Sequence, residues 1–209
     1  MTTSGQRLLQ LYFVRHGETQ WSLSGQHTGR TDIALTVHGE DQARSLGAHL
    51  RGIPFARVLT SPRQRAQRTC ELAGFASQAR IEPDLQEWDY GDYEGQCSVD
   101  IREARPDWDV FKDGGPNGET PLQISERVDR LIAKLSVLEG NVALFSHGQL
   151  GCVLAARWIG APVSEGRHFA LGAASLSILG HEASHPSTQV IALWNSMPSS
   201  LSVIPTESG

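Results

Sequence analysis

Residues 8–19 read LLQLYFVRHGET, and this stretch decides the fold. Its first seven residues are mostly large and apolar, which predicts a buried strand over residues 8–14. The strand stops at Arg15, His16 and Gly17, which place a cation, a nucleophile and an unhindered backbone at its end. Ligands of α/β proteins bind at the carboxyl ends of strands. The stretch alone leaves open a second interpretation, in which Arg15 and His16 are surface residues that follow a strand.

Two later stretches also predict strands that end in polar groups. Residues 55–60 form a second predicted strand before Ser61, and residues 141–145 form a third before Ser146 and His147. In a mostly parallel sheet all three strand ends lie at one edge. Helices are predicted at 36–51, from 61 through 73, at 99–104, from 120 through 138 and from 150 through 158, further strands at 171–179 and 190–194, and an extended piece at 81–85.

The composition is that of an ordinary globular protein. With 209 residues, 39% of them hydrophobic, the chain suits one α/β domain or two small ones. We expect a single domain over residues 1–209 with a loose tail from about residue 197. The net charge of −5 argues against a nucleic-acid partner, and the apolar run at 8–14 is too short to span a membrane. Three sparse cysteines without pair spacing predict reduced thiols in a cytoplasm.

The predicted helix after residue 60 begins with a cluster of arginines. Ser61 is a good N-cap and Pro62 suits the first helical position. Arg63, Arg65 and Arg68 would repel one another and the positive end of the helix dipole, a conflict that a bound anion would relieve. Because helical side chains lean toward the N-terminus, we expect Arg65 to reach the strand ends and Arg63 or Arg68 to face solvent. The alternative is a solvated basic turn.

Residues 86–95 form an acidic and aromatic stretch. A carboxyl group beside Trp88 would be partly desolvated, which raises its pKa and makes it a usable proton donor. Glu87, Asp89, Asp92 and Glu94 all compete for this role, and the residues alone do not choose among them.

A cationic cluster at the strand ends predicts an oxyanion ligand. Arg15, His16, Arg65 and His147 converge there, and two arginines match phosphate oxygens. The loop predicted over residues 20–29 can fold back over such a ligand, so that His27 and Thr28 donate hydrogen bonds to it, although both could simply form turns. The sequence lacks a Walker-type loop and a zinc or two-metal pattern, so the chemistry rests on His16 as nucleophile.

These motifs together resemble the histidine phosphatase superfamily, which includes the cofactor-dependent phosphoglycerate mutases. They run in the family's order up to about residue 180. They are RHGET at 15–19 with Trp21, QHTG at 26–29, SPRQRAQRT at 61–69, the stretch 87–95, GET at 118–120 and SHG at 146–148. The stretches 24–29 and 87–95 are most similar to the branch of sedoheptulose-1,7-bisphosphatases and broad-range acid phosphatases.

The resemblance implies a three-layer α/β/α sandwich with a mostly parallel central sheet, and catalysis without a metal or a cofactor. It implies that His16 is the histidine that becomes phosphorylated. Arg15, Arg65 and His147 would hold the phosphoryl oxygens, and Glu87 would be the proton donor. With less support it implies substrate contacts from Thr28, His27, Ser61 and Tyr90.

The expected function is metal-independent hydrolysis of small phosphate monoesters, such as sugar phosphates or bisphosphates. A phosphoglycerate mutase is the first alternative, but residues 96–115 carry only Arg102, Arg105 and Lys112 and lack the paired basic insertion of mutases. A protein phosphatase or a regulatory member of the fold is the second, although all the matched core residues are present. The expected partner is a small phosphorylated metabolite, and a homodimer is left open.

Overall fold

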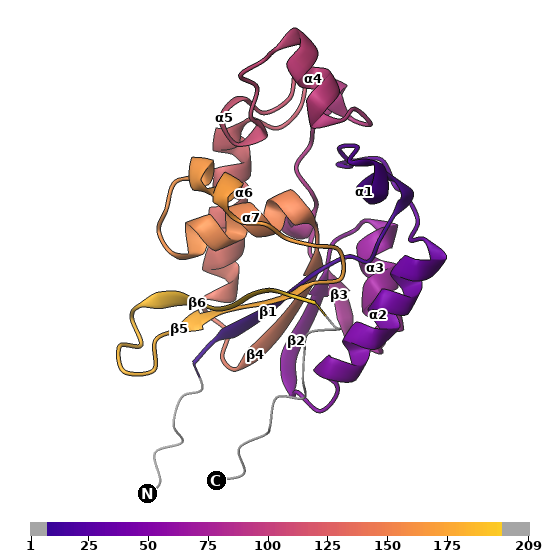
Figure 1. The fold of residues 1–209 in the computed structure, drawn as a ribbon. Coiled ribbons are helices and arrows are strands. Elements are labelled where there is room, and N and C mark those ends of the chain that lie inside the picture. The colour runs from indigo at the N-terminus through magenta and orange to yellow at the C-terminus, as the bar shows by residue number, and fades with distance from the viewer. Residues whose placement is uncertain (1–7, 198–209) are drawn as a thin grey trace, which may run out of the picture.

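The computed structural model describes residues 8–197, and a six-stranded sheet forms its centre (Figure 1). The strand order is β3-β2-β4-β1-β5-β6. The first four of these strands pair in parallel, whereas β5 and β6 are antiparallel additions at one edge. The bounds are β1 Gln10–Arg15, β2 Phe55–Thr60, β3 Ala79–Ile81, β4 Asn141–Ser146, β5 Leu176–His181 and β6 Gln189–Ser196.

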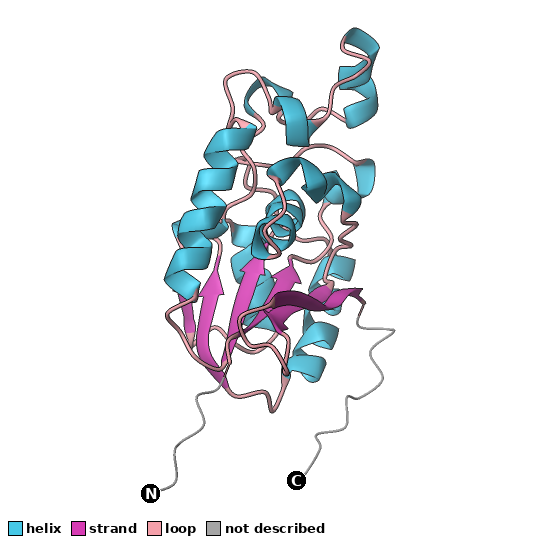
Figure 2. Ribbon diagram, turned by 90° about the vertical axis from the view of Figure 1, so that its left-hand side faces the viewer, coloured by secondary structure: helices cyan, strands magenta, loops and turns pink. Residues whose placement is uncertain are grey.

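Helices cover both faces of the sheet, which confirms the three-layer α/β/α architecture. Figures 1 and 2 show α6 and α7 on one face and α2 and α3 on the other. No helix within residues 8–197 is long and apolar enough to cross a membrane. The helices are α1 Gln20–Ser24, α2 Val37–Leu50, α3 Gln64–Leu72, α4 Ser98–Ala104, α5 Val110–Asp113, α6 Pro121–Leu135 and α7 Gly148–Trp158, with 3₁₀ turns at Pro83–Leu85, Gly91–Tyr93 and Val163–His168.

The alternation of strand side chains divides the core into two parts. Leu11 and Phe13 of β1 pack into the larger cluster, with the apolar faces of α6 and α7. Val14 of β1 packs into the other cluster, with Phe145 of β4 and Leu46 of α2. Successive side chains of a strand point to opposite faces, so a sheet covered on both sides needs large apolar residues in both registers.

Helix α6 follows its sequence signals closely. The Thr120 hydroxyl accepts a hydrogen bond from the Gln123 backbone, the Gln123 side-chain oxygen accepts one from the Thr120 N–H, and Pro121 opens the helix. The buried face consists of Ile124, Arg127, Val128, Leu131 and Leu135. One charged residue, Arg127, is therefore buried on an otherwise apolar face.

The parallel register brings three strand ends together, as predicted. Arg15 pairs with Ser146 across β1 and β4, and Thr60 pairs with Phe145 across β2 and β4. The residues that follow these strands are His16, Ser61 and His147, which leave three adjacent strands at the same edge of the sheet.

The structure corrects the prediction that residues 20–29 form a loop throughout. Residues Gln20–Ser24 form the short helix α1. Thr19 caps it: its hydroxyl accepts a hydrogen bond from the Ser22 backbone, and the Ser22 hydroxyl oxygen accepts one from the Thr19 N–H. Gly25 ends the helix in the left-handed region with φ 81°. Capping at both ends thus stabilises a single turn that has no apolar periodicity.

The start of α3 also differs from the prediction. The helix begins at Gln64, and Arg63 occupies the N-cap position without a side-chain cap. Ser61 lies two residues before this cap; its hydroxyl oxygen lies 2.7 Å from His147 Nε2 and accepts from the Arg63 N–H at 3.3 Å, not from a helical N–H group. Pro62 consequently precedes the helix rather than opening it.

Two predicted extended segments are shorter than expected. The 81–85 piece is extended only at Ile81, the last residue of β3, and at Glu82, and then forms the Pro83–Leu85 turn. The predicted strand at 171–179 begins only at Leu176, because a turn joins Ser175 to Gly172. The predicted tail falls outside the described residues from position 198 onward.

Gly39 permits the close approach of α2 to the chain that follows β1. A Cβ atom on Gly39 would lie 2.2 Å from the Glu18 carbonyl oxygen, which also accepts a hydrogen bond from the Thr36 backbone. We therefore expect Gly39→Ala to lower the free energy of unfolding by about 1–3 kcal/mol, although alanine normally favours a helix. Chemical denaturation measures this. Gly180→Ala, whose Cβ would lie 3.7 Å from Gln10, is the control, and an equal or smaller loss at Gly39 would contradict the steric argument.

Candidate active site

His16 lies directly after β1 and is 4% exposed. Its Nδ1 lies 2.7 Å from the carbonyl oxygen of Gly17, so the Nδ1–H group donates to that oxygen and the lone pair is on Nε2. Burial lowers the pKa of His16 well below its usual value, and the positive charges of Arg65 and Arg15 lower it further. The imidazole is therefore neutral, with one nitrogen available as a nucleophile.

Arg15 lies beside this histidine at the end of β1. Its Nη1 donates to the carbonyl oxygen of Leu171, whereas its Nε is buried without an acceptor among residues 8–197. A Cβ atom at Gly148 would lie 3.3 Å from Nε, so the absence of a side chain at this glycine allows the guanidinium to pack closely against the start of α7. Burial lowers the pKa of Arg15, and the negative charge of Glu87 opposes that shift.

Arg65 reaches the strand ends from α3, as its position in the helix predicted. It is fully buried, and its Nε donates to Nδ1 of His147 over 3.1 Å. Nη1 donates to the Thr31 carbonyl at 3.0 Å, and Nη2 donates to the carbonyls of Thr28 and Gly29 at 2.9 and 3.1 Å. The guanidinium thus joins α3, the loop before α2 and the end of β4.

His147 occupies the corresponding position after β4. Because its Nδ1 accepts from Arg65, a neutral ring carries its proton on Nε2, which donates to Ser61 Oγ at 2.7 Å. Burial lowers the pKa of His147 well below its usual value, and Arg65, His16 and Arg15 add to the effect. The two imidazole rings lie 5.3 Å apart between their centroids. Both histidines are therefore uncharged.

The Glu87 carboxylate lies at the N-terminus of α7 and is held there by backbone groups. Oε1 accepts from the N–H groups of Trp88 and Leu150 at 2.9 and 2.8 Å, and Oε2 accepts from Gln149 at 3.0 Å. Glu87 is 8% exposed, and its charge acts on both Arg15 and Arg65. Free N–H groups at a helix start stabilise a carboxylate, which explains why this acid lies there.

The other three acids of the stretch have different surroundings. Asp89 forms an ion pair with Arg30 at 2.8 Å, and Arg30 is largely exposed. Asp92 accepts from the side chain of Asn117. Glu94 accepts from backbone N–H groups of the loop at residues 29–31. Glu87 is thus the acid of this stretch that lies against both arginines and the start of α7.

The four predicted substrate contacts are placed unequally. Ser61 accepts from His147 and from the Arg63 backbone, which leaves its own hydroxyl proton free to donate. Thr28 offers its carbonyl to Arg65, while its hydroxyl donates to the Gln26 carbonyl. The remaining pair, His27 and Tyr90, stack with ring centroids 4.4 Å apart, and His27 Nε2 lies 3.1 Å from Ser98 Oγ.

This placement engages His27 before any ligand arrives. Its ring is buried between Tyr90 and Trp108, and burial lowers its pKa to about 4. Burial likewise raises the pKa of Tyr90, so the phenol keeps its proton. Direct contacts of these two side chains with a substrate stay predictions.

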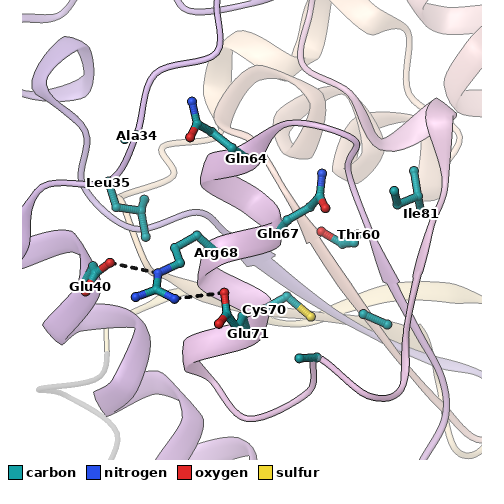
Figure 3. Close-up of a pocket in the computed structure, with 12 residues that line it drawn as sticks. Ala34, Leu35, Glu40, Thr60, Gln64, Gln67, Arg68, Cys70, Glu71 and Ile81 are labelled. Carbon is teal, nitrogen blue, oxygen red and sulfur yellow. Dashed lines mark hydrogen bonds and ion pairs between the residues drawn. The ribbon is translucent and has the colours of Figure 1, made fainter.

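Arg63 and Arg68 complete the arginine cluster. Arg68 turns away from the histidines and pairs with Glu40 and Glu71 at 2.9 Å each, beside a groove of about 630 Å³ that also includes Gln64 (Figure 3). Arg63 Nε is buried without an acceptor among the described residues, and its charge lowers the pKa of His147. The sequence predicts that Arg63 or Arg68 faces solvent; Arg68 is partly exposed and bound by two carboxylates, and Arg63 is partly buried.

Sequence reasoning missed several groups that shape this site. The carbonyl of Leu171 and the N–H groups at the start of α7 carry no side-chain signal. Arg127 and Glu119 form a buried ion pair at 2.6 Å beside the Glu87 main chain. Arg127 could have been found, because it falls between Ile124 and Leu131 on the apolar face of α6. Residues 8–197 contain no group of three or more His, Cys, Asp or Glu side chains that could hold a metal ion.

Comparisons with known proteins show which proteins this chain is similar to. An acid phosphatase of Mycobacterium tuberculosis is 40% identical over 182 residues, which cover 85% of this chain and 89% of that protein. A sedoheptulose 1,7-bisphosphatase of Saccharomyces cerevisiae is 37% identical over 184 residues, covering 73% of this chain and 68% of that one. A solved structure of a Mycobacterium tuberculosis open reading frame superposes with a TM-score of 0.84 at 36% identity, covering 90% and 98% of the two chains.

The family comparison covers almost all of the described residues. The family model described as histidine phosphatase superfamily (branch 1) matches residues 11–195, a range that contains both histidines, both arginines and Glu87. The motifs, the fold and the relatives all indicate the same family. This chain belongs to branch 1 of the histidine phosphatase superfamily.

Proposed function

We propose that this histidine phosphatase hydrolyses small phosphate monoesters, sugar phosphates or bisphosphates among them, through a phosphohistidine at His16. The observation that carries the proposal is the fixed tautomer of His16. The Gly17 carbonyl accepts a hydrogen bond from Nδ1–H, so the Nε2 lone pair is available in a buried site beside Arg15 and Arg65. The names of the two curated relatives, an acid phosphatase and a sugar bisphosphatase, support this substrate class.

In the first step, Nε2 of His16 attacks phosphorus in line with the leaving oxygen. The N–P bond forms as the P–O bond breaks, and Glu87 gives its proton to the departing alkoxide. Arg15 contributes its unpaired Nε–H to a phosphoryl oxygen, and Arg65 contributes its remaining Nη1–H. His147 can donate from Nε2 only if it releases Ser61, which otherwise donates its own hydroxyl proton.

In the second step, the Glu87 carboxylate accepts a proton from a water molecule that attacks the phosphohistidine. The N–P bond breaks, the electron pair returns to Nε2 of His16, and inorganic phosphate is released. Each turnover therefore consumes one water and restores both side chains. The N–H groups at the start of α7 stabilise the Glu87 carboxylate, which is the form that acts as base in the second step. Proton donation in the first step requires the protonated form of Glu87.

Residues 96–115 offer little support for the mutase alternative. A mutase must retain the phosphoryl group and return it to a bound glycerate, whose carboxylate needs a cationic partner. In residues 96–115 the arginines are engaged elsewhere: Arg102 donates to the Trp108 carbonyl, and Arg105 binds Tyr93 and Asp113. This favours hydrolysis over transfer.

Phosphorus NMR of the enzyme in chelator tests the proposal directly. The substrates are 3-phosphoglycerate and, in separate samples, sedoheptulose and fructose bisphosphates. We expect free phosphate from the sugar phosphates. Interconversion of phosphoglycerates with little free phosphate would identify a mutase and refute the proposal. A phosphopeptide panel in the same assay tests the protein phosphatase alternative, while a cytoplasmic location and a homodimer stay predictions.

Glu87→Gln should separate substrates by their leaving groups. A sugar alkoxide needs a proton as it departs, whereas an aryl oxide such as 4-nitrophenolate leaves readily without one. We expect kcat/KM to fall by about 10²–10⁴-fold for a sugar phosphate and much less for 4-nitrophenyl phosphate. Steady-state kinetics on both esters measure this, with thermal unfolding as a check on folding. Equal losses on both esters would contradict the role of Glu87 as the acid.

A further inference from the structure

We infer that Arg127, paired with Glu119, is the positioning residue that sets Glu87 for proton transfer. The inference rests on the proposed function, because it takes Glu87 to be the acid of that reaction. Arg127 is 5% exposed and lies in α6, behind the stretch that carries Glu87. Its action is indirect, since it binds the main chain around the acid, whereas backbone groups of α7 bind the carboxyl group itself.

All five N–H groups of the Arg127 guanidinium are engaged. Nε and Nη2 bind the two carboxylate oxygens of Glu119 at 2.8 and 2.6 Å, a bidentate pair. Nη1 donates to the carbonyls of Asp84 and Gln86 at 2.9 and 2.8 Å. Nη2 also reaches the carbonyl of Glu87 at 3.4 Å. A single side chain therefore binds three carbonyls of the four-residue segment that ends in the proposed acid.

Glu119 binds the residues that follow the acid. Its carbonyl accepts from the indole N–H of Trp88 at 2.8 Å, and its backbone N–H donates to the Asp89 carbonyl at 2.8 Å. Arg127 thus binds the main chain of residues 84–87, and its partner Glu119 binds residues 88 and 89. The Arg127–Glu119 ion pair connects these two segments.

The two ends of the Glu87 side chain are consequently fixed by different elements. The main chain is bound by α6 through Arg127, and the carboxylate is bound by the N–H groups of Gln149 and Leu150 in α7. A displacement of the main chain would pull the carboxylate away from α7 and from the phosphate site. Misplacing a catalytic group by about 1 Å can cost about 10²-fold in rate.

The chemistry of the contact selects arginine specifically. An apolar side chain at position 127 would suit the buried face of α6, but it would leave Oε1 of Glu119 and three carbonyls without a donor, and Oε2 with only the Asp89 N–H at 3.5 Å. Lysine keeps the charge but offers three donors from one point, so it cannot bind the carboxylate in a fork and the carbonyls at the same time.

Arg127→Lys tests the inference on two esters, a sugar phosphate and 4-nitrophenyl phosphate. We expect kcat/KM for the sugar phosphate to fall by about tenfold or more, and that for the aryl ester to change by less than about threefold. The assay runs below the thermal midpoint of every variant, as followed by circular dichroism. Arg130→Lys is the matched control, since Arg130 lies three residues on in α6 and pairs with Asp84 of the same segment, but is 58% exposed.

A double-mutant cycle with Glu87→Gln completes the test. If Arg127 acts through Glu87, adding Arg127→Lys to Glu87→Gln should change kcat/KM for the sugar phosphate by less than about twofold. Equal losses on both esters, or full additivity in the cycle, would make Arg127 merely structural and overturn the inference while leaving the proposed function intact. If Glu87→Gln itself shows no preference between the esters, the acid assignment fails, and the inference fails with it.

Discussion

His16→Ala should abolish turnover, with kcat/KM falling by at least about 10⁴-fold on every phosphate ester, because the covalent route loses its nucleophile. No other described group at the strand ends offers a free lone pair on nitrogen: His147 accepts from Arg65 at Nδ1 and binds Ser61 at Nε2. The leaving-group ability of the ester should not rescue the variant, which distinguishes it from Glu87→Gln. Initial rates and alkaline-quench trapping of phosphoprotein measure the effect, because the N–P bond of phosphohistidine hydrolyses in acid.

Thermal unfolding and a control variant distinguish a loss of the nucleophile from a loss of folding in His16→Ala. The variant should keep the cooperative thermal unfolding of the parent, since within the described residues the imidazole hydrogen-bonds to its neighbour Gly17 and ties no distant element to β1. His38→Ala in α2, an exposed histidine, should behave as the parent does. Wild-type rates in His16→Ala, or an undiminished phosphoprotein signal, would refute the phosphohistidine mechanism.

Arg65→Lys should combine a large catalytic loss with a loss of stability. We expect kcat/KM to fall by about 10²–10³-fold, the usual effect of removing a donor that stabilises charge in the transition state. Three lysine donors cannot replace the four bonds that Arg65 makes to His147 and to three carbonyls. Because three donors face four acceptors, at least one acceptor stays unpaired, which should lower the free energy of unfolding by about 1–3 kcal/mol. Steady-state kinetics and chemical denaturation test both parts.

The tautomer of His147 gives the Arg65 variant a further consequence. Arg65 Nε–H keeps Nδ1 of His147 unprotonated, so losing it frees the ring to place its proton on either nitrogen. Arg68→Lys in the same helix is the control: its ion pairs with Glu40 and Glu71 are partly exposed, and we expect a change of less than about 1 kcal/mol and near-normal rates. Equal effects of the two variants would contradict the role given to Arg65.

The layers of the fold could be predicted because the local signals agree with the tertiary structure. Strands β1, β2 and β4 are short apolar runs that end in polar groups, and each lies next to another in the sheet. Helix α6 has its cap, its proline and its apolar face in the expected order. Helix α1 escaped prediction because it has no buried residue, so only its capping at Thr19 and Gly25 marks it.

The site was harder to predict where it depends on backbone groups. Ser61 has every local feature of an N-cap, yet its hydroxyl binds His147, a residue 86 positions away. Four acids compete in residues 86–95, and the contact that distinguishes Glu87 is with the backbone of α7, 62 and 63 positions later. Composition cannot encode such contacts, and only the resemblance chose Glu87 before the structure placed it.

The pairing of β1 with β4 has a consequence for how this protein gains activity. His16 and His147 belong to segments far apart in the chain, and they become neighbours only when β1 pairs with β4 along its register from Gln10–Asn141 to Arg15–Ser146. Contacts between distant parts of a chain form late and slowly during folding. A partly folded chain, in which helices such as α6 and α2 have already formed, therefore holds no catalytic pocket. Enzymatic activity reports the completion of the central sheet, whereas helical content does not.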